Sequence, residues 1–427
     1  MNKSHKKKIA ILVGGGPAPG INSVIHAATI RSVLSGAEVV GVHDGFQHIM
    51  NGDITKVTSL TIKAVSRIHF QGGALIGTSR ANPTQNPQSL ATVLDSLKRL
   101  EVTGLMTIGG DDTAFSALQL EALAQGQLHV VHVPKTIDND LGLPNGVPTF
   151  GFQTARHFGV GIVKNIMVDA RTTGRWYLVV TMGRKAGHLA LGIGKAAGAT
   201  LTVIPEEFPK GPLRLAQLSR ILTGAIAKRL SLGRNDGVAI LAEGLIERLD
   251  PSELIELGTV QHDQHGHIRF SELDIGDILK HAVSKELHRY DLNITIVTKN
   301  IGYELRCADP IPYDMEYTRD LGYCAAQYLL EGGNAAMVAI CDGHFTPIAF
   351  KDILDPTTGK TMIRMVDIHS EYYTIAREYM VRLEPDDFSN HAHLDRCAKA
   401  LNVSPEEFRA TFFPVVRQKT SSQKAEE

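Results

Sequence analysis

Short runs of apolar residues recur along the chain, and most of them end at a glycine-rich or acidic turn. The runs at 9–13, 104–108, 128–133 and 237–242 are rich in Val, Ile and Leu, which is typical of strands buried on both faces of a sheet. Helical stretches follow several of these runs, and we expect them at 21–34, 114–124 and 314–330. This alternation predicts an α/β protein with largely parallel sheets.

The same alternation continues through the second half of the chain. Further strands are expected at 37–42, 176–180, 293–297 and 336–340, and a helix of small residues ends at Ala197. With 427 residues, the chain is long enough for two or three domains with apolar cores. We therefore expect two α/β lobes with a ligand cleft between them.

The turn at 134–140 carries the densest set of ionisable groups. Lys135, Asp138 and Asp140 follow the apolar run at 128–133 directly, at the carboxyl end of an expected parallel strand, where open α/β sheets place their ligands. Lys135 can hold an anion there, and a carboxylate can take a proton from a hydroxyl. The alternative is a turn in which Asp and Asn side chains bond only local backbone N–H groups.

A glycine turn at 14–20 lies between the run at 9–13 and the expected helix at 21–34. A strand, a glycine loop and a helix in this order direct backbone N–H groups and a helix N-terminus at a phosphate. Asn22 or Ser23 is available near the start of the helix. The loop matches neither a Walker motif nor GxGxxG, so an ordinary flexible turn remains the alternative.

A second glycine turn, at 109–113, carries two adjacent carboxylates, Asp111 and Asp112. Carboxylates are expected beside phosphates where a Mg²⁺ ion lies between them. The alternative is that one aspartate caps the helix that follows and the other lies in its first turn.

Three arginines and one further carboxylate lie next to expected strands or turns. Arg80 ends a glycine-rich stretch, Arg175 and Arg184 flank the run at 176–180, and Glu243 follows the run at 237–242. A planar guanidinium matches phosphate oxygens in a forked geometry, which makes these arginines candidates for phosphate recognition. Solvent-facing charge is the alternative.

Composition narrows the class of partner. The formal net charge of -1 argues against nucleic acid as the main partner, and four cysteines without a CxxC pair indicate reduced thiols. No apolar run is long enough to span a bilayer, and the basic start lacks the apolar core of a signal peptide, so we expect a cytoplasmic protein without a membrane partner. The segment with His262, His265 and His267 is expected to form a surface loop rather than a metal site, and 418–427 to fray.

Four of these motifs together resemble the phosphofructokinase family. They are Ala18-Pro19-Gly20-Ile21-Asn22, the stretches 108–113 and 133–140, and Met182-Gly183-Arg184, in that family's order and with similar spacing. The likeness extends from about residue 8 to about residue 337. It implies two Rossmann-like three-layer lobes with the active site in the cleft between them, and phosphoryl transfer to the 1-hydroxyl of fructose 6-phosphate.

The resemblance also implies roles by position. Asp138 is the expected general base, Asp111 the Mg²⁺ ligand, Gly15 a contact of the donor phosphates and Arg80 a group near the transferring phosphoryl. Arg175 matches an arginine that reaches the substrate of a neighbouring subunit, which implies a homodimer or homotetramer. The residues expected to hold the sugar phosphate are Thr136, Ile137, Asp138, Arg175, Met182, Gly183, Arg184, Glu243, Tyr303, Glu304, Leu305 and Arg306.

The resemblance further implies how the chain is divided. Residues 1–140 together with about 300–360 form the expected donor lobe, and about 141–299 the expected sugar-phosphate lobe. The stretch from about 361 to 427 is expected to be a helical segment with a frayed tail.

Two residues bear on the phosphoryl donor. ATP-using relatives usually carry glycine at the positions of Asp112 and Lys135. Asp112 adds bulk and negative charge where the α-phosphate of ATP would lie, whereas Lys135 can stabilise the phosphate that leaves pyrophosphate. Pro17, Met315 and the turn at 307–309 also depart from the usual bacterial pattern. With the Tyr303-to-Arg306 motif, they resemble the pyrophosphate-using branch of the family.

Three functions remain open at this stage. The favoured one is transfer of phosphoryl from pyrophosphate to fructose 6-phosphate, and the second is an ATP-dependent phosphofructokinase. The third is a non-catalytic regulatory subunit that binds a sugar phosphate, which should have lost the base, whereas Asp138 and Asp111 are both present. Sedoheptulose 7-phosphate offers a similar 1-hydroxyl, so the acceptor is also open.

Overall fold

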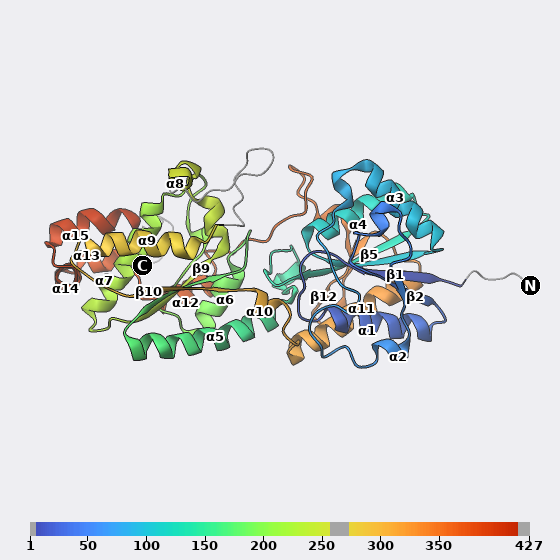
Figure 1. Cartoon of the computed structure of the whole chain (residues 1–427), viewed down its shortest axis with the longest axis horizontal. Helices are drawn as coiled ribbons and strands as arrows, with labels where there is room; N and C mark the ends of the chain where they lie inside the picture. The colour runs from blue at the N-terminus through green and yellow to red at the C-terminus, as the bar shows by residue number, and fades with distance from the viewer. Residues whose placement is uncertain (1–5, 257–272, 417–427) are drawn as a thin grey trace, which may run out of the picture. The chain divides into compact units, whose positions relative to one another are not determined.

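The computed structural model describes residues 6–256 and 273–416 (Figure 1). His262, His265, His267 and the stretch 418–427 lie outside these ranges. Within them the chain forms two compact units. The first comprises Met1–Phe158 and Tyr303–Arg364, and the second comprises Gly159–Gly302 and Met365–Glu427.

The first unit is built on a mainly parallel sheet. Its strands are β1 (Lys8–Val13), β2 (Glu38–Val42), β3 (Val57–Ser59), β4 (Gly104–Gly109), β5 (His129–Thr136), β6 (Phe150–Gly151), β11 (Ala336–Met337) and β14 (Ile348–Ala349). They are ordered β14-β11-β5-β4-β1-β2-β3, with β6 also paired to β5. The edge strands β3 and β14 run antiparallel to their neighbours. A separate hairpin joins β12 (Ile340–Cys341) and β13 (His344–Phe345).

Helices cover both faces of this sheet, as buried parallel strands require. In Figure 1, α3 and α4 lie on one face, and α1 and α11 pack together on the other. Helix α3 begins where Asn86 accepts a hydrogen bond from the Gln88 backbone N–H and Pro87 sets the first helical position, a common start signal. The helices of this unit are α1 (Ile21–Leu34), α2 (Ile62–Val65), α3 (Pro87–Arg99), α4 (Asp111–Ala124), α10 (Tyr303–Arg306) and α11 (Pro312–Leu330).

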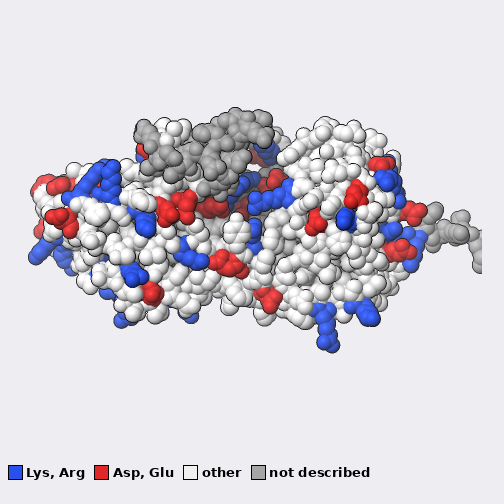
Figure 2. All heavy atoms as spheres, viewed as in Figure 1, with Lys and Arg blue, Asp and Glu red and all other residues white. Residues whose placement is uncertain are grey.

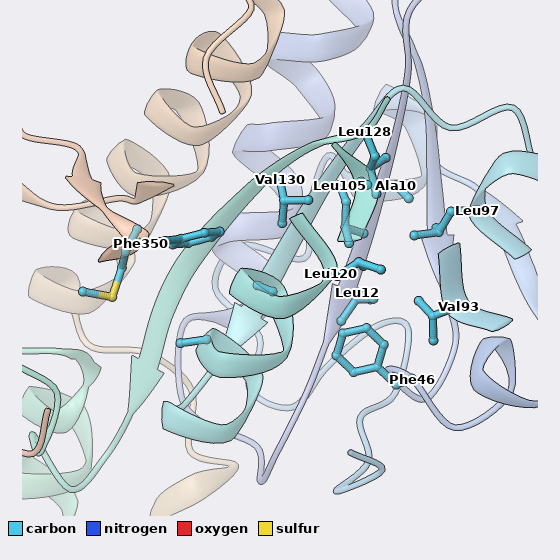
Figure 3. Packing of buried hydrophobic residues seen from close by; sticks show 14 of the residues in the cluster. Ala10, Leu12, Phe46, Val93, Leu97, Leu105, Leu120, Leu128, Val130 and Phe350 are labelled. Atoms are coloured by element: carbon cyan, nitrogen blue, oxygen red, sulfur yellow. The ribbon is translucent and has the colours of Figure 1, made fainter. Parts of the chain in front are cut away.

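The core beneath α3 and α4 is mainly aliphatic and includes two phenylalanines, Phe46 and Phe350 (Figure 3). Leu12 and Leu105 from the central strands meet Val93 and Leu97 of α3, and Phe46 closes the cluster. Burying each such side chain stabilises the fold by about 1.5–3 kcal/mol. The rigid sheet that results fixes where each strand ends.

The strand ends in the first unit are aligned by register. Val13 pairs with Ile108, and Ile108 pairs with Val133. The turns that follow β1, β4 and β5 therefore lie next to one another at the same edge of the sheet. These are the three turns that carry the glycines and carboxylates.

The second unit has a smaller sheet that is parallel throughout. Its strands β7 (Trp176–Thr181), β8 (Leu201–Val203), β9 (Gly237–Ala242) and β10 (Ile296–Ile301) are ordered β10-β7-β9-β8. Trp176 is buried among apolar residues of α7 and α9. The helices are α5 (Phe152–Thr173), within which the chain passes from the first unit to the second, α6 (His188–Ala197), α7 (Leu215–Ser231), α8 (Pro251–Glu256), α9 (Ile275–His288), α12 (Glu371–Glu378), α13 (Pro385–Ser389), α14 (His391–Ala400) and α15 (Pro405–Phe412).

The division of the chain differs from the expected boundaries in three places. Residues 141–158 belong to the first unit, since β6 pairs with β5. Residues 361–364 also belong there, because they bond to the turns after β4 and β5. From Met365 on, the chain joins the second unit rather than forming a separate segment, because Phe408 and Phe412 pack in a cluster that includes Ala227 of α7.

The α/β class with mainly parallel sheets is confirmed. No helix in the described ranges is both long and apolar enough to cross a membrane. Lys, Arg, Asp and Glu are interspersed over the face seen in Figure 2, in keeping with the near-zero net charge.

Candidate active site

The glycine turn after β1 is held against the stretch that leads to Arg80. The Gly14 N–H donates to Ile108 O at 2.9 Å, and the Gly15 N–H donates to Ser79 O at 2.8 Å. Thr78 Oγ1 donates to Gly15 O at 2.7 Å. Gly15 has a positive φ of 81°, which glycine adopts without strain. The backbone thus brings Arg80, which is exposed, beside the turn that was expected to contact donor phosphates.

Lys135 lies at the end of β5 and is almost fully buried, with 4% of its surface exposed. Its ammonium donates to Gly16 O, and a Cβ at Gly15 would lie 3.2 Å from Nζ. Burial lowers the pKa of Lys135 to about 8, and the negative charge of Asp138 is the largest opposing influence. Asp140 and Asp111 also oppose the shift, while Arg306 adds to it. The charged groups predicted to act together therefore lie within electrostatic reach of one ammonium.

Arg306 approaches the same glycine turn from α10. A Cβ on Gly16 would lie 2.8 Å from Arg306 Nη1, so the absence of a side chain at Gly16 leaves room for the guanidinium in this position. The ring of Tyr303 lies 4.7 Å from the guanidinium carbon, and Arg306 Nε is buried without a hydrogen-bond partner among the described residues. Two cations, Lys135 and Arg306, thus lie next to the turn at 14–16. Such an arrangement suits a polyanion.

Asp138 lies in a tight turn that local hydrogen bonds define. Its backbone N–H donates to Thr136 Oγ1 at 3.0 Å, and Thr149 Oγ1 donates to Thr136 O at 2.7 Å. Ile137 is buried. Asn139 has a φ of 58°, a left-handed conformation in which asparagine is among the tolerated residues, and its Oδ1 accepts from the Thr149 N–H at 3.0 Å.

Asp111 and Asp112 occupy the first turn of α4 rather than the loop before it. Gly110, the residue before the helix, has extended backbone, and the helix begins at Asp111. A Cβ on Gly109 would lie 2.3 Å from Thr113 Cβ. Carboxylates at a helix N-terminus are stabilised by the helix dipole. Asp111 is half-buried and Asp112 is exposed.

His132 contacts the residues that lead into this turn, and the sequence did not predict a structural role for it. It is fully buried on β5, with Nδ1 2.8 Å from Thr107 Oγ1 and Nε2 3.1 Å from Gly109 O. Burial lowers its pKa to about 3, so the ring is neutral near pH 7 and Nε2–H can donate to Gly109 O. No local pattern in the sequence distinguished this histidine from other residues of an apolar strand.

In the second unit the strand ends are again aligned. Thr181 pairs with both Ala242 and Ile301, so Met182, Glu243 and Gly302 follow at the same edge. The Gly244 N–H donates to Gly183 O at 3.1 Å. The structure therefore brings together, within this unit, four residues of the expected sugar-phosphate set: Met182, Gly183, Arg184 and Glu243.

Two arginines of the second unit are exposed and have local contacts. Arg184 Nε lies 3.4 Å from Glu247 Oε1. Arg175 precedes β7 and lies near the hydroxyl of Tyr177, which donates to Asp169. Both guanidinium groups are at the surface, where a phosphate can reach them.

The segment Thr361-Met362-Ile363-Arg364 contacts the turns after β4 and β5. No sequence pattern predicted these contacts. Thr361 Oγ1 donates to Asp111 O at 3.3 Å, Ile363 forms a bridge with Leu141, and Arg364 bonds to Asn139. More than two hundred residues of sequence separate these partners, and no local motif marks the segment.

Comparison with known proteins assigns this arrangement to a family. Residues 8–329 match the family model described as Phosphofructokinase. The chain belongs to the phosphofructokinase family. It is 48% identical over 95% of its length to a Thermotoga maritima member named pyrophosphate--fructose 6-phosphate 1-phosphotransferase, 98% of which is covered. A Naegleria fowleri member of the same name is 46% identical over 95% of this chain and 94% of that one.

A solved family structure shows the same fold. The pyrophosphate-dependent phosphofructokinase from Marinobacter aquaeolei matches with a TM-score of 0.65, at 16% identity, over 88% of this chain and 90% of that one. At this identity the likeness supports the fold alone. The resemblance first seen in four short motifs thus extends over most of the chain.

Proposed function

We propose that the protein transfers a phosphoryl group from pyrophosphate to the 1-hydroxyl of D-fructose 6-phosphate, reversibly, giving fructose 1,6-bisphosphate and phosphate. The observation that carries the proposal is the buried ammonium of Lys135, which lies against the glycine turn at 14–16 beside Arg306. The full-length similarity to two proteins named for this reaction supports it.

Phosphoryl transfer needs groups that position the anionic donor and a base near the attacking hydroxyl, and residues of the first unit can provide both. In the proposed reaction, Asp138 accepts the proton of the 1-hydroxyl while the hydroxyl oxygen forms a bond to the outer phosphorus of pyrophosphate. The P–O bond to the other phosphate breaks, and that phosphate leaves. Lys135 and Arg80 stabilise the charge on the phosphoryl oxygens, with Gly15 close against the donor.

The carboxylates near Lys135 suit a magnesium ion that is bound together with the substrate phosphates. Mg²⁺ in phosphoryl-transfer sites is commonly held by one or two carboxylates together with substrate phosphates, not by a full protein cage. The described residues contain no cluster of three or more His, Cys, Asp or Glu arranged for a metal, and Asp111 and Asp138 both influence the buried Lys135. We assign Asp111 as the Mg²⁺ ligand. When bound, the ion would neutralise phosphate oxygens.

The sugar phosphate is assigned to the remaining predicted residues. Thr136 and Ile137 border Asp138, and Tyr303, Glu304, Leu305 and Arg306 form α10. In the second unit, Met182, Gly183, Arg184 and Glu243 share one sheet edge. Arg175 is assigned to the substrate of a neighbouring subunit in a cytoplasmic homodimer or homotetramer. Because Arg306 also lies beside Gly16, we assign it to contacts with both substrates.

The donor preference rests on Asp112 and Lys135. Two negative charges about 4 Å apart at an effective dielectric near 20 repel by about 4 kcal/mol, before Mg²⁺ and Lys135 soften the repulsion. A difference of that size rejects ATP by orders of magnitude. Pyrophosphate ends where the α-phosphate of ATP would begin and escapes this repulsion.

An assay of the purified protein with fructose 6-phosphate, Mg²⁺ and either pyrophosphate or ATP tests the proposal. We expect turnover with pyrophosphate in both directions and little with ATP at equal concentration. Asp112→Gly should allow some use of ATP, and Lys135→Gly should mainly impair use of pyrophosphate. A wild-type preference for ATP would make the protein an ATP-dependent phosphofructokinase, and no turnover with either donor would favour a regulatory sugar-phosphate-binding subunit. Sedoheptulose 7-phosphate in place of fructose 6-phosphate tests the acceptor.

A further inference from the structure

The side chain of Arg364 donates to backbone and side-chain oxygens of the turn that carries Asp138. Its Nε donates to Asn139 O at 3.1 Å, and its Nη2 donates to Asn139 Oδ1. The third nitrogen, Nη1, donates to Val147 O at 2.8 Å. The planar guanidinium therefore joins the two sides of the loop that begins at Thr136 and returns at Thr149.

The backbone of the same residue adds a fourth contact. The Arg364 N–H donates to Asp140 O at 2.7 Å, and the preceding residue, Ile363, forms an antiparallel bridge with Leu141. The chain on both sides of Asp138 is thus bonded: Thr136 Oγ1 accepts from its N–H, and Asn139 and Asp140 are bonded to Arg364.

Asn139 shows why such a clamp is needed. A left-handed φ in a residue other than glycine costs free energy and persists only where the surroundings enforce it. Here the Asn139 side chain accepts from the Thr149 N–H and from Arg364. Without the Arg364 side chain, the turn would keep the Thr149 N–H but lose the guanidinium donors to Asn139, and the carboxylate of the adjacent Asp138 would sample other positions.

We propose that Arg364 is a positioning residue for the phosphoryl-transfer reaction, which acts by fixing the Asn139–Asp140 peptide and through it the carboxylate of Asp138. The inference rests on the assignment of Asp138 as the base. Burial lowers the pKa of Arg364, and the negative charge of nearby Asp140 opposes that shift. A lysine at this position keeps the charge but cannot reach three acceptors with one planar fork.

The test compares Arg364→Lys and Arg364→Met with the wild-type protein in the pyrophosphate assay. A displacement of a catalytic group by about 1 Å costs about 100-fold in rate, so kcat should fall by about 10- to 100-fold. KM for both substrates should stay within about threefold, because the assigned binding residues are untouched. An unchanged kcat in Arg364→Met would overturn the proposal.

A double-mutant cycle separates positioning from general loss of structure. If Arg364 acts through Asp138, then adding Arg364→Lys to Asp138→Asn should lower the residual kcat no further. A full additional 10- to 100-fold loss in the double variant would overturn the proposal. Near-normal turnover of Asp138→Asn by itself would instead remove the base assignment, and the role of Arg364 would fall with it.

Two further variants control for folding. Asn139→Gly tolerates the left-handed φ but removes the Oδ1 that accepts from Arg364, so it should reproduce the loss of kcat without changing Arg364. Arg229→Lys alters a partly buried guanidinium that donates to Asp236 O at 2.9 Å in the second unit, and should lower Tm without the loss of kcat. Equal losses of kcat in Arg229→Lys and Arg364→Lys would show that the effect is not specific to this loop and would overturn the proposal.

Discussion

Both protonation states of the buried Lys135 side chain can be populated in ordinary buffers near pH 8. Lys135 donates to Gly16 O, and burial lowers its pKa to about 8. Its ammonium form is the one that can neutralise a phosphate. Its proton therefore links donor binding to pH.

We expect kcat/KM for pyrophosphate to fall as the pH rises through about 8, since this ratio reports ionisations of the free enzyme. Bound pyrophosphate favours the ammonium, so the corresponding limb in kcat should lie at higher pH. Profiles of wild type and Lys135→Gln measure this. An identical alkaline limb in Lys135→Gln would assign it to another group.

Stability should change in the opposite direction over the same range. The folded-state pKa of about 8 lies below the usual lysine value of 10.5, so between these two values the unfolded chain binds more protons, and the contribution of Lys135 to stability rises with pH. Thermal unfolding as a function of pH, compared with Lys135→Gln, separates this effect from the loss of activity.

Asp138 should be needed for chemistry and not for folding. It lies in a turn whose hydrogen bonds use backbone atoms and the side chains of Thr136 and Asn139. We expect Asp138→Asn to keep the wild-type Tm within a few degrees and to lower kcat by about 10²–10⁴-fold in both directions, the usual contribution of a general base. Steady-state rates with fructose 6-phosphate and with fructose 1,6-bisphosphate measure this, and retained turnover would exclude the role.

At the scale of elements, one buried carboxylate joins α11 to the start of α5. Asp314 is fully buried and accepts from the Gly151 N–H at 2.9 Å, the Thr154 N–H at 2.7 Å and Thr154 Oγ1 at 2.5 Å. These bonds fix the beginning of a long helix. Burial also raises the pKa of Asp314.

Removing this carboxylate should destabilise the first unit. Asp314→Ala leaves the three donors unpaired, and because each unpaired buried donor costs about 1–3 kcal/mol, we expect a total loss of at least about 3 kcal/mol. Asp314→Asn keeps an oxygen acceptor and should lose less. Urea unfolding of both variants measures the difference, and equal losses would mean that the carboxylate oxygens are not what matters here.

The elements that could be predicted are those marked by a pattern within their own sequence, such as a glycine turn or a continuous apolar run. The glycine turn before Ile21 and the helical stretch that follows it placed α1 correctly, and the uniform apolar run placed β9. Asn22, however, does not cap α1, because its side chain bonds to the backbone of Gln71, Gly72 and Leu75.

Other elements depend on partners that the local sequence does not reveal. Strand β5 continues through Pro134 to Thr136 because β6 pairs with its last residues. The stretch at 336–340 divides because Met337 pairs with β5 and β14, whereas Ile340 pairs with β13. The expected strand at 293–297 begins three residues later, at Ile296.

At the scale of the whole molecule, the candidate site was predictable where short motifs end strands. Asp111, Lys135 and Asp138 were predicted as site residues in this way. Arg364 was not, because its contacts with Asn139 depend on chain that returns after more than two hundred residues. Long-range hydrogen bonds of this kind leave no periodic or local signature.

The expected role of Arg175 can be tested by mixing subunits. Arg175→Ala and Asp138→Asn should each have low activity, but a hybrid oligomer contains a site with an intact Asp138 and an Arg175 from its neighbour. For random pairing in a dimer, half of the dimers are hybrids with one restored site, so about a quarter of wild-type activity should return. Co-expression followed by assay measures this. Activity equal to the mean of the two variants would place Arg175 outside any shared site.

The parallel pairing of β5 with β11 has a consequence for biosynthesis. Val131 and His132 pair with Ala336 and Met337. A ribosome that adds about 5–20 residues per second synthesises these partners about 10–40 s after Val131 and His132. During that interval the nascent chain exposes an unpaired, Val-rich edge, the kind of edge that associates with other chains. Polypeptides released early, before residue 336, are expected to be the chaperone-dependent and aggregation-prone species of this protein.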